Sequence, residues 1–217
     1  MKYKAIIFLL PFIISSCSHQ EETRNAPNII KIGDYTIEFP RGFENSKEDG
    51  IDSKVGSISN GQITFRYDFG YYSNSLTPSL DEYLSRDVWK WNALAYKGLL
   101  PGGRDPQYFS ARTDLINYEL KDSSRYELKL VYERDTILYK VDVPLQISQS
   151  QIEFDTINQV AFKYVNGPEY QGLYAVDLES YNKSINSYLS LSIYVDSTNR
   201  HDAEKVMSIL KSCKHKK

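Results

Sequence analysis

Few side chains of this chain have the chemistry that enzymes use most often. Its 217 residues include three histidines and two cysteines: His19, His201, His215, Cys17 and Cys213. His201 is the one candidate general base, because it precedes Asp202 at the start of a predicted helix while the other histidines lie near the chain ends. No Gly-x-Ser-x-Gly sequence supplies a nucleophile for it. A surface histidine is the simpler interpretation, and no catalytic residue is assigned.

Metal and cofactor sites are not predicted either. The sequence has no His-x-x-x-His, no cysteine pair at metal-binding spacing and no Asp-x-Asp-x-Asp loop. The segment 99–104 contains two glycines but lacks the Gly-Lys-Ser/Thr sequence that binds phosphate. Hydrolysis by paired carboxylates stays open as an alternative, because the chain has 28 acidic residues and the sequence singles out no pair.

Composition and charge exclude several classes of protein. Aromatic residues make up 13% of the chain, with 18 tyrosines, which is too many for a disordered polypeptide. Charged residues make up 25%, which excludes a bundle of transmembrane helices. The formal net charge of −2 gives no broad basic field, so nucleic acid is not an expected partner.

A charged and apolar leader opens the chain. Lys2 and Lys4 precede the apolar run 5–14, which is about half the ~20 residues that a membrane-spanning helix needs. The sequence Ile14-Ser15-Ser16-Cys17 that follows resembles the lipobox of bacterial lipoproteins. This resemblance implies cleavage before Cys17, a diacylglycerol on its thiol and acylation of the new amino group. We therefore expect a signal peptide at 1–16 and lipidation at Cys17.

The polar segment 17–28 is expected to be a flexible tether between the lipid and a folded domain. Ser18 follows the cysteine in place of the Asp that retains many lipoproteins in the inner membrane, so the resemblance implies the outer membrane. Glu21 and Glu22 resemble acidic signals for export to the cell surface, although a solvated tether explains them equally well. The periplasmic and the surface-facing leaflet thus stay open.

Cysteine usage predicts a fold without disulfides. If lipid occupies Cys17, Cys213 has no partner within the chain. Cys213 shares a predicted helical face with Val206 and Leu210, so we expect a buried, inert thiol.

Hydrophobic periodicity predicts an antiparallel sheet with helices. Asn60-Gly61 is a strong hairpin signal, and residues alternate in polarity on its far side from 63 to 71. Ser79 and Glu82 form a capping box that opens a helix ending before Gly98. Further expected elements are strands at 35–39, 115–120, 126–132, 137–143, 152–164 with a break near 158, 172–178 and 189–195, and a helix at 199–213.

This order predicts an α+β fold over 29–217, a single domain with an antiparallel meander and two main helices packed on it. The strand that ends Phe39-Pro40-Arg41-Gly42-Phe43 and the helix that opens Ser79-Leu80-Asp81-Glu82 resemble the PsbP-like fold. That resemblance implies a small lipid-anchored accessory protein of a larger membrane assembly, in a family with few enzymes.

Exposed aromatic residues are the candidate binding sites. Tyr72 follows the first hairpin, Trp89 lies off the apolar stripe of the first helix, and Tyr108 lies in a Gly/Pro-rich loop. Packing in the core explains each of them equally well. Three Asp-Thr/Ser triplets, at 135–137, 155–157 and 196–198, resemble acceptors for O-glycans, but turns also explain them.

These observations favour a lipid-anchored envelope protein that acts as a non-enzymatic binding or accessory module for a protein partner or a glycan. Such a protein needs no cofactor. The alternative is a hydrolase of envelope or extracellular polymers with unidentified carboxylates.

Overall fold

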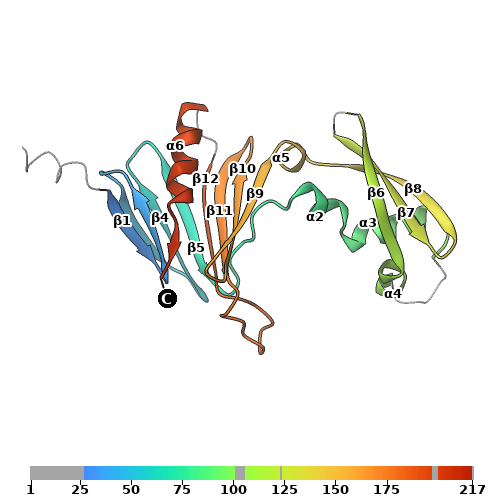
Figure 1. Ribbon diagram of the computed structural model, residues 1–217, viewed down its shortest axis with the longest axis horizontal. Helices are drawn as coiled ribbons and strands as arrows, with labels where there is room; N and C mark the ends of the chain where they lie inside the picture. Colours follow the sequence, from blue (N-terminus) through green and yellow to red (C-terminus); the bar gives the residue numbers. More distant parts are fainter. Residues whose placement is uncertain (1–26, 101–105, 123, 197–199, 217) are drawn as a thin grey trace, which may run out of the picture.

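The computed structural model describes residues 27–100, 106–122, 124–196 and 200–216 (Figure 1). These residues form mainly antiparallel β-sheets with helices packed against them, as predicted. The predicted signal peptide, Cys17, His19 and most of the predicted tether lie outside the described residues. Among the helices of the described part, none is long and apolar enough to cross a membrane.

A seven-stranded antiparallel sheet forms the larger lobe, in the order β3-β4-β5-β12-β11-β10-β9. Its strands are β3 (Glu44–Asp49), β4 (Ser53–Ser59), β5 (Thr64–Gly70), β9 (Gln151–Ile157), β10 (Val160–Asn166), β11 (Tyr170–Asp177) and β12 (Ser190–Asp196). β5 pairs with β12. This pairing joins strands that are separated by a long insertion in the sequence into one sheet. The edge strands are β3 and β9.

One face of this sheet carries the first hydrophobic core. A smaller sheet of β1 (Asn28–Ile32), β2 (Tyr35–Phe39) and β13 (Lys214–His215) and the helix α6 (Arg200–Lys211) cover that face (Figure 1). Alternate residues of β5 and β12, such as Phe65 and Ile193, point into this core because side chains of a strand alternate between faces. Cys213 is 6% exposed in the same core, which confirms the predicted burial of its thiol.

The insertion between β5 and β9 folds around a second hydrophobic core. It contains the sheet β6 (Thr113–Asp122), β7 (Arg125–Tyr132) and β8 (Asp135–Asp142), with the helices α2 (Leu80–Leu84), α3 (Asp87–Tyr96), α4 (Pro106–Ala111) and α5 (Leu145–Ser148). Leu94, Leu128 and Ile137 are fully buried or nearly so there. Figure 1 shows this small-sheet lobe beside the large-sheet lobe. The segment predicted as one domain thus contains two cores among its described residues.

The predicted hairpin at Asn60-Gly61 is confirmed between β4 and β5. The side chain of Asn60 accepts hydrogen bonds from the backbone N–H groups of Gln62 and Ile63, and Gly61 adopts the left-handed φ of +84° that the turn requires.

The helix predicted from Ser79 to Gly98 is in fact two helices, α2 and α3, and here the prediction was wrong. The capping box of Ser79 and Glu82 is present at the start of α2. The break comes at Arg86, whose backbone is extended. The indole N–H of Trp89 donates to the carbonyl oxygen of Tyr83 at 2.6 Å. In an unbroken helix this oxygen would accept from the backbone N–H of residue 87. Here the hydrogen bond from the Trp89 side chain takes the place of that backbone hydrogen bond.

Several short elements were not predicted, namely β1, β3, α4, α5 and β13. β3 has no apolar alternation because it is an exposed edge strand. β13 is two residues long and exists only through its pairing with β2. His215, near the chain end, lies in β13.

Candidate binding cleft

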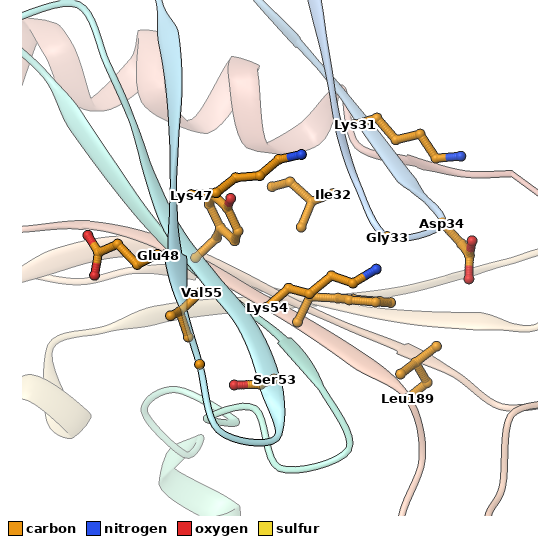
Figure 2. A pocket seen from close by; sticks show the side chains of 13 residues that line it. Lys31, Ile32, Gly33, Asp34, Lys47, Glu48, Ser53, Lys54, Val55 and Leu189 are labelled. Carbon is orange, nitrogen blue, oxygen red and sulfur yellow. The ribbon is translucent and has the colours of Figure 1, made fainter.

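An open cleft of about 800 Å³ lies at one end of the large-sheet lobe (Figure 2). The turn between β1 and β2 forms one side, and the hairpin of β3 and β4 forms the other. Residues of β5 and Leu189, just before β12, complete the lining. The lining residues are Lys31, Ile32, Gly33, Asp34, Lys47, Glu48, Gly50, Ser53, Lys54, Val55, Tyr67, Phe69 and Leu189.

The β1–β2 turn sits directly on an aromatic ring. Gly33 has a left-handed φ of +57°, and Ile32 pairs with Tyr35 across the two-residue turn. A Cβ atom at position 33 would overlap the ring of Phe69. Glycine is therefore needed here both for the backbone conformation and for the close approach. This contact fixes one wall of the cleft.

The opposite wall depends on a second aromatic residue. The Tyr67 side chain crosses the backbone of Gly56, and its hydroxyl donates to the side-chain oxygen of Asn45 at 3.1 Å. Burial raises the pKa of Tyr67, so the hydroxyl stays a neutral donor. Through this hydrogen bond, Tyr67 links β5 to the edge strand β3, which carries Lys47.

Three lysines from three strands line the cleft. Lys31 extends from β1, Lys47 from β3 and Lys54 from β4. The Lys54 ammonium lies 5.6 Å from the centroid of the Phe69 ring, in a cation–π contact. Among the side chains that the structure describes, none forms an ion pair with these three ammonium groups.

The two carboxylates of the lining do not balance these charges. Figure 2 shows Glu48 pointing away from the lysines. Lys47 and Glu48 are consecutive residues of β3, and consecutive side chains of a strand point to opposite faces of the sheet. Asp34 lies at the β1–β2 turn. The cleft is locally cationic although the chain has a net charge of −2. Its chemistry suits binding of anions and offers no facing carboxylates for acid–base catalysis.

The three predicted aromatic sites do not gather on this cleft. Tyr72 is 59% exposed, just beyond the end of β5. Trp89 is partly buried against the second core, and its ring lies 5.3 Å from that of Tyr83. Tyr108 is exposed on α4, where Arg112 packs over its ring. Trp89 on α3 and Tyr108 on α4 thus belong to the small-sheet lobe, whereas Tyr72 lies just after the end of β5 in the large sheet.

A buried group of titratable side chains was also not predicted. His215 Nε2 lies 3.8 Å from an oxygen of Asp177, and the Tyr35 ring lies 4.9 Å from the imidazole ring. Burial raises the pKa of Tyr35, with a further contribution from Cys213, and burial raises the pKa of the Cys213 thiol to about 12. Because these groups are enclosed in the first core, we interpret them as packing residues. Cys213 is therefore held as an unreactive thiol.

The remaining candidates give no site. His201 lies in the first turn of α6, as predicted. Within the described residues, no cluster of three or more His, Cys, Asp or Glu could hold a metal ion. The sequence comparisons assign no family, since no protein-family model and no curated protein matches this chain. The cationic cleft is thus the candidate site, and its three lysines were missed because only the pairing of distant strands unites them.

Proposed function

We propose that this chain is a lipid-anchored outer-membrane protein that binds an anionic partner in the cationic cleft and catalyses no reaction. The lipobox ending at Cys17 supports the anchor. The resemblance to the PsbP-like fold, with two main helices on an antiparallel sheet, supports an accessory role beside a larger assembly. The antiparallel sheets and α6 are features that favour this resemblance.

The observation that carries the proposal is that Lys31, Lys47 and Lys54 line one cleft and that none of them has an ion-pair partner among the described side chains. The lining contributes three ammonium groups against two carboxylates, so the cleft has a surplus positive charge that a bound anion would neutralise. The ammonium groups stay accessible at the rim of an open cleft, so an incoming carboxylate need not displace a buried ion pair.

An extended acidic segment of a protein fits this cleft better than a glycan. Sugars stack on exposed aromatic faces, but Tyr67 and Phe69 are only 5% and 6% exposed. The wall strand β3 is a sheet edge, so it can add a further strand through its backbone groups. A strand with acidic side chains would pair with β3 and place carboxylates beside Lys47.

Titration of the lipidated protein in lipid nanodiscs tests this proposal. A hepta-glutamate peptide is expected to bind the wild type, more weakly as salt is raised. Changing Lys31, Lys47 and Lys54 to Gln is expected to weaken binding about tenfold or more. The matched control changes three exposed lysines elsewhere to Gln, namely Lys129, Lys140 and Lys183.

Equal losses in the two triple variants, or no binding by the wild type, would contradict the proposal. Tighter binding of polygalacturonate than of the peptide would identify a glycan as the partner instead. The anchor has its own test: cells fed labelled palmitate should label the wild type, and a Cys17→Ala variant that is still labelled would exclude lipidation at this residue.

A further inference from the structure

A second pocket, of about 390 Å³, lies between the two lobes and is separate from the cationic cleft. Its floor is the face of the large sheet that α6 does not cover. Its other side is the segment 75–86, which leads into α2 and the small-sheet lobe. The volume falls in the range of sites for small molecules.

The floor of this pocket is apolar and partly aromatic. Phe154, Lys163 and Tyr174 are direct neighbours across β9, β10 and β11, so their side chains point to the same face. Ala161 and Val176 form the next cross-strand pair on that face. Phe154 is 63% exposed, although its cross-strand neighbour Lys163 is buried. An exposed phenyl group at the mouth of a pocket is suited to contact an apolar ligand.

A buried cation lies among these apolar groups. The Lys163 side chain is 9% exposed, and its ammonium contacts the carbonyl oxygen of Ser75 and a carboxylate oxygen of Glu82, both at 3.3 Å. An ammonium group has three N–H donors, so one is left for a further acceptor. Glu82 also accepts from the backbone N–H of Ser79, which divides its charge between two partners.

A second cation stands at the side of the pocket. Arg86 lines the pocket, and its guanidinium packs 5.0 Å from the centroid of the Tyr83 ring. Within the described residues, Arg86 forms no ion pair. Glu82 is the one carboxylate of the lining, so the pocket has a surplus positive charge beside apolar walls.

We propose that this interlobe pocket binds a small amphipathic anion, an aryl carboxylate, with the carboxylate on Lys163 and Arg86 and the aryl group against Phe154 and Val176. The free donor of a buried ammonium favours an anionic acceptor, because charge-assisted hydrogen bonds are strongest away from water. Such a ligand contacts both lobes, since Glu82 and Arg86 belong to the insertion and the floor belongs to the large sheet. Binding would therefore stabilise the lobes in their present arrangement.

The test uses 2-naphthoate and its neutral analogue 2-naphthylmethanol, titrated by fluorescence into the lipidated protein in nanodiscs, with empty nanodiscs subtracted. The wild type is expected to bind naphthoate saturably and the alcohol at least tenfold more weakly. Lys163→Gln should remove this preference. Arg86→Gln and Phe154→Ala change more accessible side chains, so they report on the pocket even if Lys163→Gln fails to fold, and each should weaken naphthoate binding about tenfold.

Two matched changes locate the binding. Ala161→Leu on β10 should fill the pocket and abolish binding of both compounds, whereas Ile157→Ala alters an exposed residue of the neighbouring edge strand β9, outside the pocket, and should leave binding unchanged. Equal affinities for the acid and the alcohol, an unchanged affinity in Arg86→Gln and Phe154→Ala, or no saturable binding by the wild type would overturn the proposal. The cleft lysines are untouched in all these variants, so binding in the cleft and binding in the interlobe pocket can fail separately.

Discussion

At the scale of single residues, Gly33 and Gly61 offer a controlled comparison, because both adopt a left-handed φ but differ in surroundings. A Cβ atom at Gly33 would overlap the Phe69 ring, whereas one at Gly61 would meet nothing within 4 Å. Gly61→Ala should therefore lower the free energy of unfolding by about 1 kcal/mol from backbone strain alone. Gly33→Ala should lower it by about 3 kcal/mol, because the clash adds to the strain. Denaturation in urea measures both, and equal losses would show that the turn does not need to lie on Phe69.

Trp89 and Tyr72 form a second pair, and the structure separates their roles. Trp89 packs on the second core and its indole N–H satisfies the Tyr83 carbonyl, so Trp89→Ala should lower the free energy of unfolding by about 2 kcal/mol. Tyr72 is 59% exposed, so Tyr72→Ala should change the free energy of unfolding by less than about 0.5 kcal/mol. A large loss on Tyr72→Ala, measured by thermal unfolding, would place Tyr72 in a packed site.

At the scale of elements, the start of α2 links a capping box to an ion pair. Burial disfavours the charged form of Glu82, but the N–H of Ser79 and the Lys163 ammonium outweigh it and lower the pKa of the carboxyl below its ordinary value of 4.5. A carboxyl with a lowered pKa in the fold stabilises it above the ordinary pKa, and this contribution is lost as pH falls through the folded value.

The Glu82→Gln variant tests this directly. Gln can keep the capping box but not the charge, so the variant should be less stable than the wild type at pH 7, by about 1 kcal/mol after allowance for solvent screening. The difference should start to shrink as pH falls below the ordinary pKa of 4.5 and should vanish below the lowered pKa of the folded state, where the wild-type carboxylate is protonated. Unfolding in urea at a series of pH values measures it. A gap that is constant with pH would show that the ion pair with Lys163 contributes nothing.

Local sequence signals predicted the elements that local interactions stabilise. The Asn60-Gly61 hairpin, the Ser79–Glu82 capping box and the strand pattern of β6, β7 and β8 are all present. The break between α2 and α3 was not predictable, because no Gly or Pro marks it and its cause is the contact of Trp89 with the Tyr83 carbonyl. Sequence periodicity carries no information about such a tertiary contact.

The candidate cleft was not predictable for a related reason. Lys31, Lys47 and Lys54 look like ordinary surface charges in sequence, and β3 lacks any strand pattern. They line one cleft only because β1 and β2 lie over the large sheet, with Gly33 on the ring of Phe69. The chemistry of the site thus depends on contacts between distant segments, whereas each lysine by itself gives no signal.

At the scale of the whole molecule, the described residues have two hydrophobic cores joined through the segment 71–86 and α5. The contacts between the lobes include polar ones, such as the ion pair of Lys163 with Glu82 and the hydrogen bond of Gln146 with Glu169. The large-sheet core contains both ends of the described chain, in β1 and β13, while the small-sheet core is continuous in sequence. Polar contacts of this kind stabilise little compared with buried apolar area.

We therefore expect the lobes to unfold as two units. Leu128 and Leu191 are both fully buried, one in each core, so replacing either by Ala removes the same side chain and should cost about 2–5 kcal/mol. In native-state hydrogen exchange, Leu128→Ala should speed exchange of amides in β6, β7, β8 and α3 and leave β5, β11 and β12 protected, and Leu191→Ala should do the reverse. If each variant instead speeds exchange uniformly over both lobes, the two cores fold as one cooperative unit, and the polar contacts between them are stronger than their geometry indicates.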